Sequence, residues 1–507
     1  MLMNYGISFL LTSFIVREIS AEAYGFTNLC NNIVNYATLI TIVLNSVAGR
    51  FITIEIHRGN KERANKYFSS TVIANLIICS LLFIIFIQFS ISIDQIFDIP
   101  DYLVSDVRVL FLLVAFNLVL NVFTSVFTVS TFITNNLYLS SLANAIGIVV
   151  RSLSLFLFMK FDPNIRYVGV ATILGSTVIF LMNIYFLKKL CPDFKIRKSD
   201  FSISYVKELI SSGIWNTVSK LSQILSDGFD LVITNIWIGV YAMGQLSIAY
   251  TIPTVISSFL SMIINVFNPQ LTEYYAKGKK DEIIKAITLN MKMTAFFGNV
   301  IFFGFVAMGK DFFSLFVPTA NIDLVYVLAI FAISSLLSSS IVSPLSNVFL
   351  LTNKLKVNSV VWFFVSVFDA ILLVILLNTT SMGIYAVAFV SKIVGTIVNL
   401  TFLPLYASRC LSTNPLVFYK LIFRYTLTSI FLGVVIILCR ELLGEINSWS
   451  LFVVRCAFLG LIGFIVNYTC FLQNEERVYL KNVIISKIWP QHHVNHVTKL
   501  RNASDKN

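Results

Sequence analysis

Charged residues are scarce in this 507-residue chain, at 12% of the total, which is about half the share of an ordinary soluble domain. Proline and histidine are few as well, with 10 and 4 residues, whereas 57% of the chain is hydrophobic and the mean hydropathy is +0.84. This balance excludes a disordered chain, a coiled coil and most soluble enzymes. A protein that crosses a membrane many times is the class that remains.

The chain also lacks the motifs of common enzyme classes. It has no Walker motif or GxGxxG, so ATP is not a direct driver of any transport, and it has no HExxH or nucleophile elbow. Its seven cysteines never form CxxC and mostly lie in apolar runs. The longest loop on the expected outer side, Ser92–Asp106, is too short for a catalytic site. We therefore expect no enzyme, no cofactor and no metal; the HHxxH at His492 would bind metal only adventitiously.

Fourteen apolar runs recur along the chain, each bounded by charged or turn residues. A segment in lipid must satisfy its own backbone hydrogen bonds, so runs of about 20 residues are helices. The sequence therefore predicts an all-α integral membrane protein with about 14 transmembrane helices. The expected spans are Met1–Val16, Phe26–Gly49, Ser69–Ile91, Val107–Phe132, Tyr138–Met159, Tyr167–Leu187, Ile210–Ile236, Ser247–Leu271, Ile284–Met308, Leu324–Leu345, Val357–Leu377, Ile384–Tyr406, Leu421–Cys439 and Ser450–Gln473.

The first span is short and leaves an alternative open. Apolar Ile7–Val16 followed by Ala21-Glu22-Ala23 resembles a signal peptide, but a positive segment before it is missing and Arg17-Glu18 interrupt it. We expect a retained helix, with a true start upstream of Met1 as a further alternative.

Lysine and arginine predict the orientation. Of the 37, the connections after helices 2, 6, 8, 10 and 12, with their flanks and the tail, hold 26, and the connections on the other side hold six. This split predicts that both termini are cytoplasmic, and it explains the net charge of +12 without any nucleic-acid partner. The basic tail, residues 474–507, is expected to lie on anionic lipid of the inner leaflet.

An internal repeat appears at a shift of 219 residues. Ala23-Tyr24-Gly25 meets Ala242-Met243-Gly244, and Arg58–Glu62 meets Lys277–Asp281. A shift of six helices gives the halves one orientation, which is typical of transporters with a substrate site between the halves. We therefore expect two parallel six-helix repeat lobes around a central cavity, at residues 1–200 (N-lobe) and 201–415 (C-lobe), followed by two extra helices at 416–473.

Polar residues form a stripe on the seventh span. Asn216, Lys220, Gln223, Asp227, Asp230 and Thr234 follow one another in steps of four and three, so they share one helix face. Charges at the bilayer centre each cost at least about 2.5 kcal/mol, so this face must meet protein, partner groups or water. A buried ion-pair network is one interpretation, and a water-filled central cavity is the preferred one. Arg151 and Asp369 also lie deep in spans, and Lys392 lies at intermediate depth; deep cations would suit a pyrophosphate.

Several segments resemble those of bacterial polysaccharide flippases. They are Arg17 with Tyr24-Gly25, the loop Arg58–Glu62, Asp230 in Asp-Leu-Val-Ile-Thr, Gly239–Gly244, and Pro269 followed by Lys277-Gly278-Lys279. On these segments, its length and its helix count, the chain resembles Wzx-type oligosaccharide-lipid flippases of the multidrug/oligosaccharidyl-lipid/polysaccharide exporter superfamily. The resemblance covers nearly the whole chain, although Met243 replaces the tyrosine of the first half.

The resemblance implies a flippase that moves undecaprenyl-pyrophosphate-linked oligosaccharide across the bacterial inner membrane by alternating access, coupled to an ion gradient. A polysaccharide such as lipopolysaccharide O-antigen would be the product, and polysaccharide polymerase machinery a candidate partner. A lipid II flippase or a multidrug antiporter of the same superfamily is the alternative, and a membrane glycosyltransferase or polymerase is disfavoured by the short loops. The candidate substrate-binding residues are Arg17, Arg50, Arg151, Lys220, Asn216, Gln223 and Lys392.

The candidate ion-coupling residues are Asp227, Asp230 and Asp369. Asp227 and Asp230 lie about 4.5 Å apart along a helix axis, where two carboxylates repel each other unless one binds a proton or a cation. A carboxylate that binds a cation on one side and releases it on the other can couple transport to a gradient. A structural ion pair of the aspartates with Lys220 is the alternative.

The charge distribution makes the topology testable. Single cysteines at Asn60 and Lys279 should react with a membrane-impermeant reagent only after permeabilisation, whereas a cysteine at Asp98 should react in intact spheroplasts. Labelling of the Lys279 position from outside would overturn the predicted orientation.

Overall fold

The computed structural model describes residues 12–472, apart from 135, 228, 353, 443 and 445–447, together with Arg477. Within these residues it describes only the backbone of His57, Trp215, Asn216, Ser219, Ser226, Asp227, Pro269 and Ala276. All regular secondary structure in the described residues is helical. The first part of the chain forms α2 (Ala21–His57), α3 (Lys61–Ile91), α4 (Ile93–Ile96), η1 (Asp101–Leu103), α5 (Val104–Phe127), α6 (Val129–Ile133), α7 (Leu137–Phe161), α8 (Arg166–Leu190) and η2 (Lys198–Asp200).

The second part of the chain continues the same pattern of long helices with short connections. It forms α9 (Ile203–Asp227), α10 (Phe229–Trp237), α11 (Val240–Ala249), α12 (Thr251–Val266), α13 (Asn268–Ala276), α14 (Lys280–Phe316), α15 (Ile322–Ile333), α16 (Leu336–Val342), η3 (Ser343–Leu345), α17 (Ser346–Leu351), α18 (Leu355–Thr379), α19 (Ile384–Leu411), α20 (Leu416–Glu441), α21 (Trp449–Val466) and the π-helical turn η4 (Asn467–Phe471).

Twelve helical stretches of the described residues are long and apolar enough to cross a membrane. They coincide with twelve of the fourteen expected spans, so the all-helical membrane class is confirmed. Most of the first expected span, and nearly all of the tail at 474–507, lies outside the described residues. The helices also expose large apolar side chains, such as Phe431 on α20 at 52% and Val454 on α21 at 64%. Lipid tails, rather than water, are the surroundings that suit such surfaces.

The seventh expected span, Ile210–Ile236, is helical on both sides of residue 228, which lies outside the described residues. α9 covers Ile203–Asp227 and α10 covers Phe229–Trp237. α9 packs on α2 and α18, whereas α10 packs mainly on α11. The shared face of Asp227 and Asp230 stays a prediction, because the side chain of Asp227 also lies outside the described residues.

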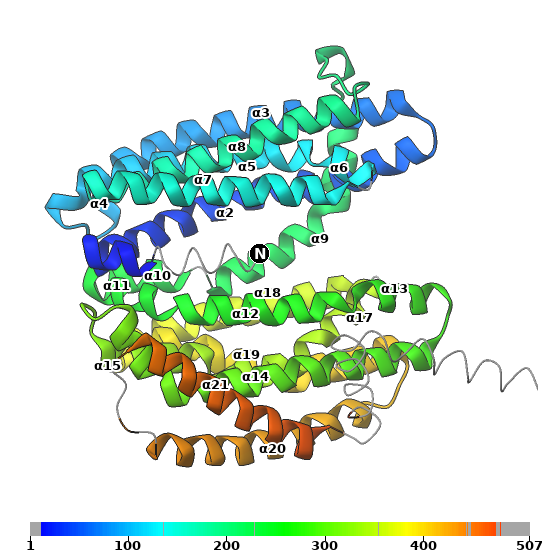
Figure 1. Cartoon of the computed structure of the whole chain (residues 1–507). Coiled ribbons are helices and arrows are strands. Elements are labelled where there is room, and N and C mark those ends of the chain that lie inside the picture. Colours follow the sequence, from blue (N-terminus) through cyan, green and yellow to red (C-terminus); the bar gives the residue numbers. More distant parts are fainter. Residues whose placement is uncertain are drawn as a thin grey trace, which may run out of the picture. The chain divides into compact units, whose positions relative to one another are not determined.

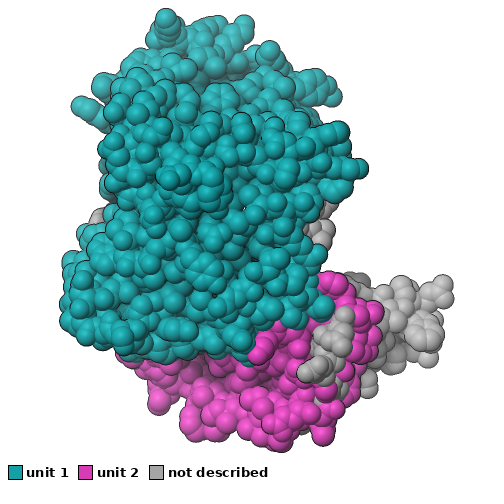
Figure 2. Space-filling model, turned by 90° about the vertical axis from the view of Figure 1, so that its left-hand side faces the viewer, with its two compact units in different colours: residues 1–259, 312–335, 349–398 teal, residues 260–311, 336–348, 399–507 magenta. Residues whose placement is uncertain are grey.

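Contacts divide the chain into two compact units, coloured teal and magenta in Figure 2. Unit 1 comprises residues 1–259, 312–335 and 349–398, and unit 2 comprises residues 260–311, 336–348 and 399–507. Within unit 1, α3, α5, α7 and α8 run alongside one another (Figure 1), with α5 and α7 both packed on α8. The lobe boundaries expected from the repeat remain a prediction.

The repeat seen in the sequence has a counterpart in backbone geometry. Gly59 and Gly278 both adopt positive φ, at 79° and 66°, a conformation that glycine reaches without strain. In each turn the residue after the glycine donates its N–H five residues back, Asn60 to Glu55 O at 2.9 Å and Lys279 to Tyr274 O at 3.0 Å. These hydrogen bonds close a helix C-terminus as in the Schellman motif. The two turns are thus equivalent in structure as well as in sequence.

The glycines of the second repeated motif contact each other. A Cβ on Gly25 would lie 3.1 Å from Gly244 Cα, and a Cβ on Gly244 would lie 2.8 Å from Ala21 O. α2 and α11 therefore approach at backbone distance, as small residues permit in membrane helices. The Tyr24 hydroxyl lies 3.2 Å from Thr251 Oγ1 beside this contact. Repeat-related residues thus join the start of α2 to α11.

The close contact of α2 and α11 can be tested by the addition of one methyl group. Gly244→Ala should lower the melting temperature of the purified protein, because overpacking of a tight contact costs about 1–3 kcal/mol. Gly304→Ala on α14 is the matched control, since nothing lies within 4 Å of its Cβ position. Equal melting temperatures for the two variants would contradict the close approach of α2 and α11.

A buried amide pair holds the last two helices of unit 2. Asn467 Nδ2 donates to Asn299 Oδ1 at 2.8 Å, and Asn299 Nδ2 donates back to Asn467 Oδ1 at 3.0 Å. Asn299 also donates to Ser429 Oγ at 3.3 Å, and both asparagines are fully buried. Since Asn299 lies on α14, Ser429 on α20 and Asn467 on η4 after α21, this network joins three helices. Hydrogen bonds between side chains are a recognised means of helix association in membranes.

Removal of one asparagine of this pair should lower the stability of the protein. Asn467→Leu leaves Asn299 Oδ1 buried without its hydrogen-bond donor, which should lower the free energy of unfolding by about 1–3 kcal/mol. The double variant Asn299→Leu, Asn467→Leu should lose less than the sum of the two single variants. Thermal unfolding of the four proteins measures this coupling, and strictly additive losses would contradict it.

Candidate functional site

A small acidic pocket with a cavity volume of about 10 Å³ lies within unit 1, where α9, α10, α18 and α19 meet. Two aspartates from helices far apart in the sequence line it, Asp230 on α10 and Asp369 on α18, and Ser391 on α19 stands with them. The remaining lining residues are apolar: Leu225, Phe229, Ile233, Ala370, Leu373, Val387 and Val390. The pocket thus gathers oxygen atoms inside an apolar wall.

Asp230 is 4% exposed and is held by its neighbours. The Tyr250 hydroxyl donates a hydrogen bond of 2.6 Å to Asp230 Oδ2. The ring of Tyr36 on α2 stacks on Phe229, with 5.4 Å between ring centroids, and Tyr36 is near enough to interact electrostatically with Asp230. Two tyrosines from α2 and the α11–α12 junction therefore surround this carboxylate.

Asp369 is 6% exposed and is less well satisfied. Its Oδ1 atom and the Oγ atom of Ser391 are both buried without a hydrogen-bond partner among the described residues. Lys392 and Asp230 both interact electrostatically with the Asp369 carboxylate, one attracting and the other repelling its charge. Buried oxygens that lack partners carry a desolvation cost of about 1–3 kcal/mol each.

The acidic pocket has the chemistry of a small-cation site. Two carboxylates that share a poorly solvated space repel each other, so a proton or a cation between them lowers their energy. The hard oxygen atoms of Asp230, Asp369 and Ser391 suit a proton or an alkali cation. No group of three or more His, Cys, Asp or Glu residues with metal-binding geometry occurs among the residues described.

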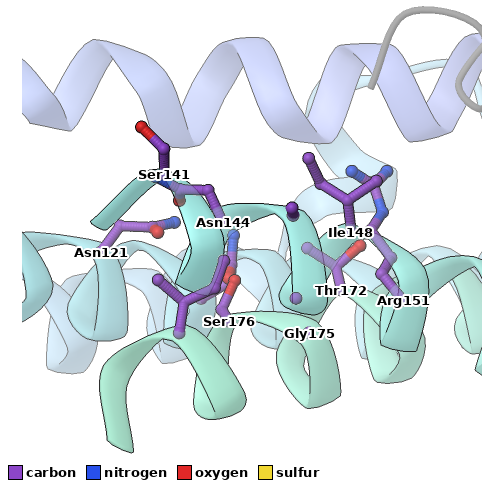
Figure 3. Close-up of a pocket in the computed structure, with 12 residues that line it drawn as sticks. Asn121, Ser141, Asn144, Ile148, Arg151, Thr172, Gly175 and Ser176 are labelled. Atoms are coloured by element: carbon purple, nitrogen blue, oxygen red, sulfur yellow. The ribbon is translucent and has the colours of Figure 1, made fainter. Parts of the chain in front are cut away.

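A second and larger pocket, with a cavity volume of about 630 Å³, lies among α5, α7 and α8, also in unit 1. Figure 3 shows Asn121, Ser141, Asn144 and Ser176 gathered toward one end and Arg151 toward the other, beside Ile148 and Thr172. Its residues are Asn117, Asn121, Ser141, Asn144, Ala145, Gly147, Ile148, Arg151, Thr172, Gly175, Ser176 and Ile179. We call it the Arg151 pocket.

Two glycines position the arginine. A Cβ on Gly147 would lie 2.9 Å from Gly175 O, and a Cβ on Gly175 would lie 2.6 Å from Gly147 O, so α7 and α8 touch at backbone distance. Arg151 is one helical turn after Gly147 on the same face. A Cβ on Gly175 would also come within 2.9 Å of Arg151 Cβ. The close helix crossing therefore confines the arginine at the pocket wall.

Arg151 and Asp369 occupy equivalent positions of the repeat. They are 218 residues apart, the shift that also superimposes Thr134–Leu137 on Thr352–Leu355. Each stands fourteen residues after the first residue of a 25-residue helix, α7 or α18. The two equivalent helices therefore carry opposite charges at the same depth, each lining a pocket.

The structure separates the other residues that the sequence singled out. Lys220 Nζ donates to Gln223 Oε1 at 3.0 Å on α9, away from the acidic pocket. Arg17 donates to Leu315 O at 2.8 Å, and Arg50 is exposed near the other end of α2, about 45 Å along the helix. The side chains of Asn216 and Asp227 lie outside the described residues. Asp230, Asp369 and Lys392 are thus the predicted residues that the structure brings together.

Sequence reasoning missed several pocket residues. Ser391 was overlooked although it precedes Lys392, and Asn144, Thr172 and Ser176 were not singled out. Single Ser, Thr and Asn residues in spans commonly join helices, so composition does not mark them as site residues. The equivalence of Arg151 and Asp369 was the signal that would have pointed to the α7–α8 crossing.

Comparison with known proteins agrees with this architecture. Residues 1–275, more than half of the chain, match the family of polysaccharide biosynthesis proteins. The uncharacterised membrane protein EpsK of Bacillus subtilis is 29% identical over 455 residues, which cover 88% of each chain. These findings confirm the resemblance to polysaccharide exporters and make the chain a multi-pass membrane protein.

Solved structures show the same fold. The chain is similar to the lipid II flippase MurJ in an inward closed conformation, with a TM-score of 0.69, 16% identity, and coverage of 95% of this chain and 99% of that chain. It is equally similar to an inward-facing multidrug resistance MATE family transporter of the MOP superfamily, with a TM-score of 0.69, 16% identity, and coverage of 82% and 96%. The expected fold, that of the MATE and MurJ transporters, is confirmed.

Proposed function

We propose, from the premise that this chain belongs to the polysaccharide biosynthesis protein family, that it moves a lipid-linked oligosaccharide across the plasma membrane by alternating access. The substrate would be an oligosaccharide on undecaprenyl pyrophosphate, destined for a surface polysaccharide such as O-antigen. The observation that carries this proposal is a polar, positively charged pocket among membrane-spanning helices, in a chain with the fold of lipid and drug transporters. A polar headgroup needs such a route because lipid excludes it.

We assign the coupling ion to the acidic pocket. Asp230 on α10 and Asp369 on α18 line one pocket, so a change of conformation that separates α10 from α18 would change their affinity for a cation. A cation can shift a conformational equilibrium only by the difference between its affinities for the two states. Two facing carboxylates provide that difference because they hold a cation together and lose it when they part. Lys392 would compete with the cation and ease its release.

The arginines and lysines have different proposed roles. Arg151 is the proposed contact for the substrate headgroup, because it lines the larger pocket. Arg17 and Arg50 remain proposed contacts for the pyrophosphate as it passes the ends of α2. Lys220, with Gln223 and Asn216, would line the path along α9, while Lys392 would act on the acidic pocket through its electrostatic interaction with Asp369. Asp227 also remains a candidate for coupling.

A lipid II flippase is the second candidate, and the observation that favours it is the 95% coverage of this chain by the MurJ fold. The two candidates differ in substrate and not in mechanism. Proteoliposomes that contain the purified chain should translocate an undecaprenyl-pyrophosphate-linked oligosaccharide faster than lipid II. Translocation of lipid II alone would replace the first candidate by the second.

The coupling proposal is tested with aspartate variants. Asp230→Asn and Asp369→Asn should each reduce transport driven by a proton or sodium gradient at least about tenfold, because an amide cannot hold the cation as a carboxylate does. Exchange of labelled substrate without a gradient should continue, since substrate binding is intact. Asp101→Asn, at an exposed residue of η1, is the matched control.

The two kinds of assay distinguish coupling from stability. Loss of both exchange and gradient-driven transport would indicate a damaged protein, and the melting temperature of each variant checks this directly. Normal gradient-driven transport with normal pH and sodium dependence in both asparagine variants would overturn the coupling site.

A further inference from the structure

We propose that the Arg151 pocket is a saccharide subsite that recognises a sugar residue bearing a single anionic group, a carboxylate or a phosphate monoester, in the glycan of the substrate. This inference rests on the proposed function and states which part of the substrate the pocket takes. It assigns Arg151 to the glycan rather than to the pyrophosphate. Arg151 is then a specificity-determining residue of the transporter.

The charge of the pocket is the first argument. Of the twelve residues that line it, Arg151 is the single charged one, and the polar groups otherwise are three asparagines, two serines and a threonine. A pyrophosphate carries several negative charges and attracts several cations. One guanidinium among neutral amides and hydroxyls matches one negative charge on a molecule rich in hydroxyl groups. That combination describes an acidic sugar.

Unsatisfied polar atoms are the second argument. Arg151 Nε and Asn117 Oδ1 are both buried without a hydrogen-bond partner among the described residues, and no ion pair to Arg151 occurs there. Buried polar groups in folded proteins are nearly always satisfied, so two such atoms in one pocket call for a ligand or water. One is a donor and the other an acceptor. A sugar satisfies both, because its anionic group accepts and its hydroxyls donate.

The shape of the pocket is the third argument. Figure 3 places the amides and hydroxyls of Asn121, Asn144 and Ser176 at one end and the guanidinium of Arg151 at the other, with Gly175 between them. The glycines of the α7–α8 crossing leave the wall free of side chains there, and Ile148 and Ile179 supply apolar surface. A pyranose ring presents apolar C–H groups on its faces and hydroxyls on its rim. The pocket offers matching surfaces for both.

The repeat provides the fourth argument. The equivalent position on α18 carries Asp369, and its pocket is small, acidic and mostly apolar. Equivalent positions of the repeat therefore carry a cationic residue in the first half and an anionic residue in the second. A purely structural arginine at this depth would be expected to have a carboxylate partner, because an unpaired charge in a membrane is costly. Arg151 has no such partner in the described part of the chain.

Binding to the full-length protein in lipid nanodiscs tests the subsite. The probes are a tetrasaccharide with one uronic acid, the same tetrasaccharide after reduction of its carboxyl group, and a tetrasaccharide with one phosphate monoester. Wild-type protein should bind at least one acidic probe about tenfold or more tightly than the reduced probe, because hydrogen bonds to a charged group add about that much affinity. The acidic probe that binds more tightly identifies the anionic group that the pocket prefers.

The variants assign the preference to Arg151. Arg151→Gln should abolish the preference for the acidic probe and keep the affinity for the reduced probe, whereas Arg151→Lys should keep part of the preference. Thr172→Val should lower the affinity for the acidic and the reduced probe by a similar factor, since it removes one hydroxyl from the pocket wall. Lys160→Gln, at the exposed end of α7, is the matched control and should behave as wild type.

The contrary outcomes are equally definite. Equal affinity of wild-type protein for the acidic and reduced probes, or a preference that survives Arg151→Gln, overturns the subsite. Displacement of the acidic probe by equimolar inorganic pyrophosphate overturns the assignment to the glycan. Translocation in proteoliposomes tests the proposed function separately. If wild-type protein transports the lipid-linked reduced glycan as fast as the acidic one, the subsite is refuted and the flippase function is supported.

Discussion

The cost of an ionised side chain in the middle of a bilayer governs where the polar groups of this molecule lie. Arg151, Asp230 and Asp369 are each within apolar stretches of the sequence, where a charge costs at least about 2.5 kcal/mol. In the structure each of these three side chains lines a pocket inside unit 1, and large apolar side chains are the ones that remain exposed. Close helix crossings at glycines then fix the walls of these pockets. The sites and the packing therefore follow from one constraint.

Two kinds of buried polar cluster occur in the described part of the molecule. The amides of Asn299 and Asn467 are fully paired and join helices, as a structural network requires. In the two pockets, Asp369 Oδ1, Ser391 Oγ, Arg151 Nε and Asn117 Oδ1 lack partners among the described residues. Buried atoms elsewhere, such as Asn183 Oδ1 and Asn358 Oδ1, also lack partners, so an unsatisfied atom does not by itself mark a binding site. The pockets differ in that such atoms stand beside free space that a ligand can fill.

The duplicated architecture allows two chemistries in one framework. Equivalent turns at Gly59 and Gly278 have the same backbone hydrogen bonds, so the two halves share their local folding rules. The equivalent helices α7 and α18 nevertheless carry opposite charges at the same depth. Under the proposed function, one half would hold an anionic part of the substrate and the other the coupling cation. Divergence at one position of a repeat is sufficient for this division.

Parts of the site could be predicted because a charge within an apolar run is conspicuous. Asp230, Asp369 and Lys392 were found in this way, and they do come together. The same method did not show which neighbours these residues would have, because periodicity reports which residues share a helix face and carries no information on what that face packs against. Lys220, on the same predicted stripe as Asp230, contacts Gln223 on its own helix. Asn144, Thr172 and Ser176 were missed because residues of their kind also join helices.

The sequence by itself determined the helical membrane class, the positions of twelve spans and the repeat, because lipid compels every spanning segment to satisfy its own backbone and the chain therefore signals each span locally. The tertiary structure alone decided which polar residues share a pocket. Asp230 meets Asp369 only through the packing of α10, α18 and α19, and Arg151 faces Thr172 only because Gly147 and Gly175 let α7 and α8 touch. Contacts of this kind depend on side-chain fit between distant segments, which no local pattern records.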